Sequence, residues 1–563
     1  MKRTLSILFA FTLVVFMFTG CAGNNGGQAT PTPAAPVATQ SAAPGNTPTP
    51  ESAPPATEDD NQLEYLTIAI SADENSMTPI TYVSGSPGFD IMKLMYDSLF
   101  AVSAENTVIP WMIEDDYDIS DDFKTFKMTL LDGQMWHDGT PLTAEDVVFT
   151  FDYYKNTYVH GRWTPIATKT ESVTASGNEI TIVLAAPDPG FLRAGLADIR
   201  IISKNAYENA ESAEAVPNMG SGAYKLVEYK TGEYYTLEAM DNYFRGTPRV
   251  KTIRMPIIKD ANVAQQALIA GEIAASTRNI SPELIENFSN TSGITVESSE
   301  GYASLLLLMD NEKAPFDDPE FRRAVSYAID IDTIINQVYL GYAERGTAGY
   351  VRKGLDEHTA GLDYVFDINK GNELLDSLGY TEKGADGMRL RLNGEDMTLV
   401  LLTSASNPQR MRSAEIIAQQ LAAIGLHVEV QSPDGSGDLV WPEMDTSLDR
   451  SYDMSMFGWS APVIQRAGTI IGACSSDYAN TGGQNLPHYV SEEFDALASE
   501  FLQSTDAAER ANLNEEMQRV VADDTPFITL LFADTICAVN YDMYDGWVFA
   551  KGTNAVNLYS FLN

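Results

Sequence analysis

The spacing of apolar residues along the chain predicts a mixed α/β protein. Leu63–Ile70 has the apolar pattern of a buried strand, and apolar and polar residues alternate in Phe123–Leu131 as in a half-buried strand. Phe89–Phe100 has the spacing of a helix. In Met411–Gly425 the apolar residues fall on one helical face, and the final glycine is suited to end that helix.

The stretch Tyr452–Pro462 predicts a strand that carries an aromatic side chain to a cavity. Its apolar run, Met454–Phe457, leads into Gly458 and Trp459 and then into small residues. Glycine lets another group approach the backbone closely, and tryptophan offers a large rigid face with one N–H group. Two interpretations stay open: Trp459 lines a ligand pocket, or it is a core residue under a turn.

Residues 1–20 have the pattern of a secretory signal peptide. Two basic residues precede an apolar run from Leu5 to Phe18, which is too short for an ordinary membrane span. The sequence up to Cys21 resembles the bacterial lipoprotein processing box, in which the cysteine becomes the lipidated first residue of the mature protein. A plain cleaved signal followed by an unrelated cysteine is the alternative.

Residues 21–62 predict a disordered tether between this signal and the folded chain. From Asn24 onward the segment is rich in Ala, Pro, Thr, Gly and Ser, with eight prolines between Pro31 and Pro55. Such a composition cannot bury enough apolar surface to fold. We therefore expect a protein anchored through Cys21 at the cell surface, on the outer face of the bacterial cytoplasmic membrane, or on the periplasmic side in a Gram-negative cell.

The charge of the chain excludes nucleic acid as a partner. The formal net charge is −42, with 36 Lys and Arg against 78 Asp and Glu, so the basic surface that nucleic acid requires is missing. Acidity favours solubility and by itself names no ligand. Beyond Cys21 the sequence has Cys474 and Cys537, and it leaves them either paired or buried and reduced.

A motif at Trp136–Phe151 carries the first family resemblance. It contains an Asp-Gly turn signal, then Thr143 as an N-cap, and Glu145 and Asp146 at the positive end of a helix. The pattern W-x-D-G-x-P-L-T-A-E-D-V-V-F-T-F resembles the signature of the extracellular solute-binding proteins of family 5. These are the oligopeptide, dipeptide and nickel receptors of ABC importers.

Later segments resemble the same family in the same order along the chain. They are Gly220–Leu226, Asn242–Gly246, Ala270–Ile273, Pro315–Asp330, Met411–Gly425 and Asp453–Trp459. The resemblance spans Leu63 to about Trp547, which is nearly the whole chain after the tether.

The resemblance implies an α/β, two-lobed periplasmic-binding-protein fold, of type II and cluster C-like, with an inserted subdomain in lobe I. The implied ranges are 63–101, 216–303 and 530–563 for lobe I, 102–215 for the inserted subdomain and 304–529 for lobe II. The apolar runs Leu305–Met309 and Phe527–Phe532 suit the two crossovers between the lobes. Proteins of this kind close over a solute by a hinge motion.

The same resemblance implies a receptor that has neither catalysis nor a cofactor. It would capture a peptide-like or other small solute between its lobes and deliver it to the permease subunits of an ABC importer. It would act as a monomer, held at the membrane by the lipid on Cys21. The alternatives are an oligosaccharide-binding member of the family, or a sensor or adhesin that kept the fold without an importer.

Segments that bind ligand in the family's peptide receptors have counterparts in this chain, and Trp441 and Trp459 offer faces on which a sugar ring would stack. The implied ligand-binding residues are Ser84, Gly85, Ser86, Thr277, Arg278, Asn279, Asn407, Arg410, Trp441, Gly458, Trp459, Ser460 and Ala461. For the loop at Ser84–Ser86 a plain surface turn stays the alternative.

Pro462 departs from the peptide receptors, in which an aspartate at this position pairs with the free amine of the peptide. A buried ammonium group without a carboxylate partner is costly, so we expect ordinary amine-anchored peptides to bind poorly. Arg278 and Arg410 are instead candidates for holding a carboxylate or another anionic group. The alternative for both arginines is a surface ion pair.

An enzyme is the rival class of protein. The sequence contains no G-x-S-x-G and no H-E-x-x-H motif. Its histidines are scattered along the chain, so we expect no preformed metal cluster, although folding can bring distant residues together. They are His137, His160, His358, His427 and His488.

Overall fold

The structure is a computed structural model, and the residues it describes fall within the unit Asp59–Asn563. The described ranges are 62–74, 77–80, 86–157, 163–212, 215–355, 357–405, 407–432, 452–459, 468–479 and 484–562. The predicted signal peptide, Cys21 and nearly all of the predicted tether lie outside these ranges.

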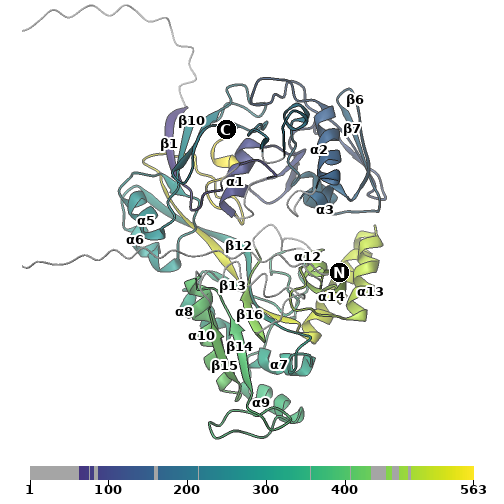
Figure 1. The fold of residues 1–563 in the computed structure, drawn as a ribbon, viewed down its shortest axis with the longest axis vertical. Helices are drawn as coiled ribbons and strands as arrows, with labels where there is room; N and C mark the ends of the chain where they lie inside the picture. Colours follow the sequence, from purple (N-terminus) through teal and green to yellow (C-terminus); the bar gives the residue numbers. More distant parts are fainter. Residues whose placement is uncertain are drawn as a thin grey trace, which may run out of the picture. The chain divides into compact units, whose positions relative to one another are not determined.

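A mixed sheet of 11 strands runs through this unit (Figure 1). Its order is β15-β14-β16-β12-β17-β11-β1-β10-β9-β8, and β13 pairs with β17 beside this path. The strands are β1 Leu63–Ala69, β8 Tyr224–Lys230, β9 Tyr234–Ala239, β10 Val250–Pro256, β11 Ala275–Ser276, β12 Ile294–Met309, β13 Ala343–Arg345, β14 Thr398–Leu402, β15 His427–Gln431, β16 Met454–Phe457 and β17 Phe527–Asn540.

Two smaller antiparallel sheets lie between β1 and β8 in the chain. One pairs β2 Phe100–Val102 with β3 Val108–Pro110. The other has the order β4-β5-β7-β6, with β4 Asp118–Ile119, β5 Thr125–Thr129, β6 Thr170–Ser176 and β7 Glu179–Leu184.

Helices flank these sheets. The α-helices are α1 Ser86–Met95, α2 Ala144–Asn156, α3 Thr164–Ala167, α4 Lys204–Glu208, α5 Ala261–Ile269, α6 Ile285–Ser289, α7 Pro319–Ala328, α8 Ile331–Val338, α9 Ile368–Ser377, α10 Pro408–Ala422, α12 Gly468–Cys474, α13 Glu492–Gln503 and α14 Ala507–Asp524. A π-helical turn covers Leu192–Leu196, and 3-10 turns cover Pro282–Leu284, Ser476–Tyr478 and Leu558–Ser560.

Buried side chains form separate cores, which define two lobes. Lobe I surrounds the core that contains Leu66, Phe151 and Trp547. Lobe II surrounds two neighbouring clusters, one containing Leu307 and the other Phe494. Because burial of apolar surface is the main stabilising term in folding, each lobe has its own source of stability.

The long strands β12 and β17 pass from one lobe to the other side by side. Their antiparallel register runs from Ile294 opposite Asn540 to Leu308 opposite Phe527. Figure 1 shows β12 extending from the region of β1 and β10 to the region of β13 and β16. The register shifts after Ser299, and Gly301 lies in this irregular stretch. Only glycine fits there, because a Cβ would lie 1.7 Å from the carbonyl oxygen of Ala533.

Several predicted elements are confirmed, and one is partly wrong. Strand β1 matches the predicted strand, and Thr143 is the N-cap of α2. The predicted helix Phe89–Phe100 is wrong at its end, because α1 stops at Met95 and Phe100 begins β2. An apolar run does not distinguish a buried helix from a buried strand, and here tertiary hydrogen bonds to Asp97 decide the break.

Cys474 and Cys537 are both buried and unpaired. Cys474 belongs to the core around Phe494 in lobe II, and Cys537 belongs to the core of lobe I. Their location in different cores rules out a disulfide between them in this structure. Among the described residues, no helix combines the length and the apolar character that crossing a membrane requires.

Candidate functional site

Strand β16 ends at a glycine that packs against the neighbouring strand. Met454 and Met456 are fully buried, and β16 pairs with β12 from Met454 opposite Met309 to Phe457 opposite Leu306. A Cβ on Gly458 would lie 2.2 Å from the carbonyl oxygen of Ser304. The strand exit therefore requires glycine, as its sequence pattern suggested.

Trp459 follows this glycine and is held by its backbone. Its N–H group donates to Ser304 Oγ at 3.3 Å, and its carbonyl oxygen accepts the N–H group of Ser304 at 3.1 Å. Its ring lies edge-on to the ring of Phe457, with centroids 5.0 Å apart. The indole is half-buried against the core of lobe II that contains Phe494, so it combines a packing role with an exposed face.

Arg410 reaches the same place from the first turn of α10. The N-cap of this helix is Asn407, whose Oδ1 accepts the backbone N–H of Arg410 at 3.0 Å. The Nη2 atom of Arg410 lies 3.1 Å from the position that a Cβ on Gly458 would take. Asn407 thus positions the helix, and Arg410 brings a cation to the exit of β16.

The guanidinium of Arg410 has no hydrogen-bond or ion-pair partner among the residues that the structure describes. Burial lowers its pKa, and the phenol of Tyr339 acts in the opposite direction. Burial also raises the pKa of Tyr339 to about 12, so this phenol is neutral near pH 7. A half-buried cation with no described anion beside it favours a site that binds an anionic group.

The predicted residues Thr277, Arg278 and Asn279 lie in lobe I, directly after β11. The Arg278 Nη2 atom donates to the carbonyl oxygen of Lys259 at 2.9 Å, and Asn279 Oδ1 accepts from Asn554 Nδ2 at 3.0 Å. The hydroxyl of Thr277 accepts a backbone N–H from the segment after β1 at 3.3 Å. These contacts tie the segment to its own lobe and give Arg278 a structural partner that Arg410 does not have.

The remaining predicted ligand-binding residues are not among those that the structure describes. Ser84, Gly85, Trp441, Ser460 and Ala461 lie outside the described residues, as does Pro462. Ser86 begins α1, but its side chain is also outside the described part of the chain.

A cavity of about 1520 Å³ opens between the two lobes. Residues that line it include Phe89, Arg193 and Tyr559 from lobe I, and Glu357, Phe501 and Arg510 from lobe II. None of the described predicted residues lines this cavity. Its position between the lobes nevertheless makes it part of the space that a hinge motion would close.

The cavity is far less acidic than the chain as a whole. Among the residues that the structure describes, seven lysines and arginines line the cavity, against five aspartates and glutamates, whereas the whole chain has 36 against 78. This local balance favours solutes that carry negative charge.

Arg193 is a lining residue that sequence reasoning missed. It lies in the π-helical turn Leu192–Leu196, and its Nη2 atom donates to Asn106 Oδ1 at 2.6 Å. Burial lowers its pKa, while Glu357 of the opposite lobe acts against that shift. π-Helical turns are frequent at functional sites, but their i→i+5 hydrogen bonds have no sequence signature, so no pattern pointed to this residue.

The chain matches the family model of the bacterial extracellular solute-binding proteins, family 5 middle, over residues 107–480. It is 26% identical to the oligopeptide-binding protein AppA of Bacillus subtilis over 486 residues, which cover 81% of this chain and 84% of the relative. It is 25% identical to the dipeptide-binding protein of Escherichia coli over 503 residues, covering 83% of this chain and 89% of that protein.

Solved structures have the same two-lobed fold. The structure of AppA in complex with a nonapeptide has a TM-score of 0.74 and 22% identity, and the match covers 89% of this chain and 99% of that one. A periplasmic oligopeptide-binding protein of Thermotoga maritima with bound mannohexaose has a TM-score of 0.71 and 22% identity, with 86% and 93% covered.

Proposed function

The chain belongs to the bacterial extracellular solute-binding proteins of family 5, and we propose that it captures a solute with a carboxylate group, held by Arg410. As a substrate-binding protein of the ABC transporter type, it binds a peptide-like or other small solute between its lobes and passes it to an importer. We infer that it does so without catalysis.

One observation carries the choice of an anionic group. Arg410 is half-buried, it lies beside the backbone of Gly458, and no described residue neutralises it. A planar guanidinium matches a carboxylate with two parallel hydrogen bonds, and the pairing is strongest where water is excluded. The cavity between the lobes supports the same choice through its local excess of basic residues.

The test is a set of one peptide in four forms: unmodified, N-acetylated, C-terminally amidated, and modified at both ends. We expect amidation to weaken binding by tenfold or more, because it removes the carboxylate that Arg410 would hold. We expect N-acetylation to change affinity little, because Pro462 stands where an amine-binding aspartate is expected. Isothermal titration calorimetry measures both effects, and tight binding that depends on the free amine alone would contradict the proposal.

Two arginine variants test whether Arg410 is the residue that holds the carboxylate. Arg410→Gln should bind the unmodified and the amidated peptide equally weakly. Arg412→Gln is the matched control on the same helix, since Arg412 is exposed and pairs with Glu415 at 2.9 Å. If Arg410→Gln keeps the preference for the free carboxylate, the anion is held elsewhere.

An oligosaccharide is the second candidate, and the half-buried ring of Trp459 favours it. A sugar ring would stack on this indole, and the similar protein from Thermotoga maritima binds mannohexaose. Thermal-shift measurements against linear oligosaccharides distinguish the two, because a ligand of the folded form raises the melting temperature.

The membrane attachment and the lobe boundaries are part of the same proposal. We infer that Cys21 is lipidated and anchors a monomer, and that the chain crosses between the lobes near residues 304 and 529. A Cys21→Ser variant should appear in the culture medium instead of the membrane fraction. Retention of that variant at the membrane would mean that another segment anchors the protein.

A further inference from the structure

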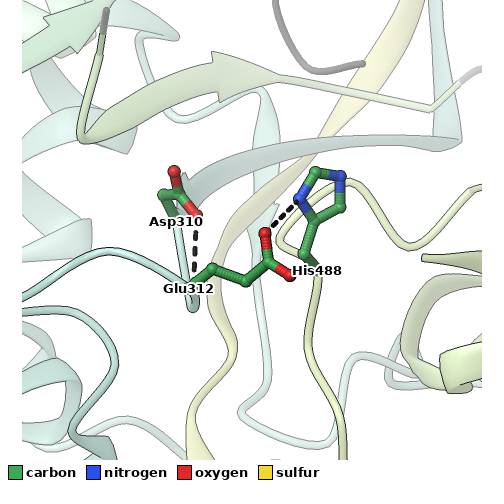
Figure 2. Close-up of side chains that lie close together, drawn as sticks. All are labelled: Asp310, Glu312 and His488. Carbon is green, nitrogen blue, oxygen red and sulfur yellow. Dashed lines mark hydrogen bonds and ion pairs between the residues drawn. The ribbon is translucent and has the colours of Figure 1, made fainter. Parts of the chain in front are cut away.

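Folding brings three metal-binding side chains together in lobe II, at the far end of β12 from Ser304. Asp310 and Glu312 follow β12, and His488 lies in the loop before α13. One oxygen of each carboxylate and one ring nitrogen of His488 lie within 4.8 Å of one another. Figure 2 shows the Glu312 carboxylate directed at the His488 ring, with Asp310 on the same turn. We propose that these three side chains bind one divalent transition-metal ion, such as Zn²⁺.

The donor set selects this class of ion. Calcium and magnesium take oxygen ligands almost exclusively, whereas one imidazole with two carboxylates is a mixed set that suits zinc and its first-row neighbours. Two carboxylate ligands also balance the charge of a dication. Lys313, which follows Glu312, does not compete, because its ammonium group pairs with Asp453 at 2.8 Å.

The loop that carries His488 is held in place before any ion binds. His488 is only 4% exposed, and its backbone is in the left-handed region with φ of 54°. Asn485 fixes this loop, since its Nδ2 donates to the carbonyl oxygens of Tyr489 at 2.7 Å and Ser475 at 3.0 Å. A non-glycine residue is seldom found in this region of backbone conformation, and such residues cluster at functional sites.

The turn that carries the two acids is fastened to the same loop. The backbone N–H of Asn311 donates to the carbonyl oxygen of Pro487 at 3.0 Å, next to His488. Asp310 is 5% exposed, and its Oδ1 accepts the backbone N–H of Glu312 at 3.2 Å. The two segments therefore present their donors from a fixed framework, which lowers the ordering cost of binding.

Glu312 supplies the adjustable ligand. Its side chain is 57% exposed, and its Oε2 lies 3.5 Å from His488 Nδ1. Ligand atoms around zinc lie about 2.0–2.2 Å from the ion, so the cluster must contract on binding, and the exposed arm of Glu312 allows this. Water would occupy the remaining coordination position on that exposed side.

This cluster is separate from the region around Arg410 and Trp459. Asp310 lies six residues beyond Ser304 along β12, which is roughly 20 Å at the rise of an extended strand. The metal site therefore does not depend on the identity of the solute.

Calorimetric titration of the EDTA-treated, solute-free protein with ZnCl₂ tests the proposal. We expect one equivalent to bind in the micromolar range or tighter, and Co²⁺ to give the visible absorption of a nitrogen- and oxygen-ligated ion. Glu312→Gln should weaken binding at least tenfold, and His488→Gln should abolish it. His427→Ala, which removes an exposed histidine on β15, is the matched control and should bind like the unmodified protein.

If the buried His488 variant fails to fold, Glu312→Gln still tests the proposal. Because Glu312 is exposed, Glu312→Gln should unfold in EDTA at the same temperature as the unmodified protein. Arg410→Gln should keep full zinc binding, which separates this site from the solute site. Equal zinc affinity in Glu312→Gln, His427→Ala and the unmodified protein would overturn the proposal, since the ion would then be bound by other surface carboxylates.

Discussion

Gly458 sets the geometry around Arg410. The position of its missing Cβ lies 2.2 Å from the carbonyl oxygen of Ser304 and 3.1 Å from Arg410 Nη2. Any side chain would therefore push the strand exit away from β12 and take the space of the guanidinium. The absence of a side chain is therefore what lets β12 and the Arg410 guanidinium both lie against the backbone of this residue.

The variant Trp459→Ala distinguishes a role of the indole in packing from a role in contacting the ligand. We expect the variant to lose solute affinity by tenfold or more, because a large aromatic face contributes strongly to binding. The melting temperature should fall little, since the indole is only half-buried. Titration with the peptide or oligosaccharide that binds in the tests above measures the effect. Unchanged affinity together with a large drop in stability would mean that Trp459 is a core residue and nothing more.

The sequence alone does not distinguish which of the two candidate arginines is available to bind an anion. Arg278 and Arg410 were equivalent as residue types, but a backbone carbonyl 2.9 Å away occupies Arg278, and nothing described occupies Arg410. Arg193 escaped notice altogether. Whether an arginine is partnered depends on tertiary neighbours far away in the chain, and no local pattern encodes those neighbours.

The C-terminal end of α14 is capped by an arginine from another helix. Arg322 of α7 is 4% exposed and donates to the carbonyl oxygens of Asp524 at 2.8 Å, Thr525 at 3.0 Å and Phe316 at 2.7 Å. The last carbonyls of a helix have no partners within it and carry its negative end, so a cation there is stabilising. Burial lowers the pKa of Arg322 to about 10, which leaves it charged at neutral pH.

We expect Arg322→Met to destabilise lobe II by about 2–4 kcal/mol, because it leaves several buried carbonyl groups without a donor. Urea denaturation followed by tryptophan fluorescence and circular dichroism measures this loss.

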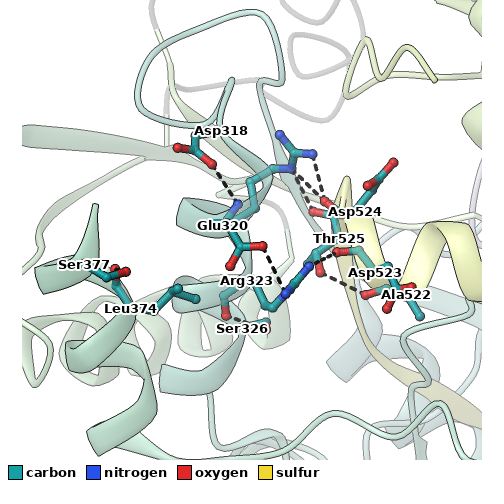
Figure 3. Close-up of polar contacts among 11 residues, drawn as sticks. Asp318, Glu320, Arg323, Ser326, Leu374, Ser377, Ala522, Asp523, Asp524 and Thr525 are labelled. Carbon is teal, nitrogen blue, oxygen red and sulfur yellow. Dashed lines mark hydrogen bonds and ion pairs between the residues drawn. The ribbon is translucent and has the colours of Figure 1, made fainter. Parts of the chain in front are cut away.

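Arg323→Met is the matched control on the adjacent position. Figure 3 shows Arg323 between Glu320 and the end of α14, and it pairs with Glu320 at 3.0 Å while its side chain is 36% exposed. Removal of such an exposed pair should cost less than about 1 kcal/mol. Equal losses in the two variants would show that burial is not the source of the effect.

His137 joins the turn before α2 to the segment before β8. Its Nδ1 accepts the N–H of Gly220 at 3.2 Å, and its Nε2 donates to the carbonyl oxygen of Gly222 at 3.1 Å. This arrangement requires the neutral ring, and burial lowers the pKa of His137 to about 4. The segment thus depends on a histidine that stays uncharged.

The pH dependence of stability follows from that shift. Below pH 6.5 the unfolded chain takes up a proton at His137 while the folded protein does not, so stability is lost as pH falls from about 6.5 to 4. The loss at pH 4 should be about 2 kcal/mol after allowance for partial exposure. His137→Gln keeps a donor and an acceptor without a titrating group, and should show a smaller change between pH 7 and pH 4.5. Identical pH profiles would contradict the assignment.

Elements with strong local signals were predicted well. The helical face and final glycine of Met411–Gly425 correspond to α10, and Gly425 has the expected positive φ of 81°. The strand pattern before Gly458 corresponds to β16. The strand that begins at Phe100 and the pairing of β16 with β12 were not predicted, because they depend on contacts between distant parts of the chain.

Opposite charges face each other across the cavity between the lobes. Arg193 of lobe I interacts with Glu357 of lobe II, and Arg510 of lobe II interacts with Asp188 of lobe I. Both arginines have pKa values that burial lowers. These two pairs attract the lobes to each other before any solute binds.

We expect Glu357→Gln to weaken solute binding two- to fivefold by disfavouring arrangements in which the lobes are close. Small-angle scattering of the solute-free variant should give a larger radius of gyration, and the difference should shrink at 1 M salt. Glu233→Gln is the matched control, since Glu233 pairs with Lys230 at 2.8 Å on the surface of lobe I, away from the cavity lining. A variant with unchanged affinity and radius would show that these charges do not affect closure.

The two links between the lobes are neighbouring strands of one ladder, β12 and β17, and this has a mechanical consequence. Sliding one lobe past the other along the strands would break the whole row of hydrogen bonds at once, whereas bending across the face of the ribbon at the irregular stretch after Ser299 breaks few of them. The ribbon is therefore stiff in shear and compliant in flexure. Relative motion of the lobes has, in effect, a single soft direction.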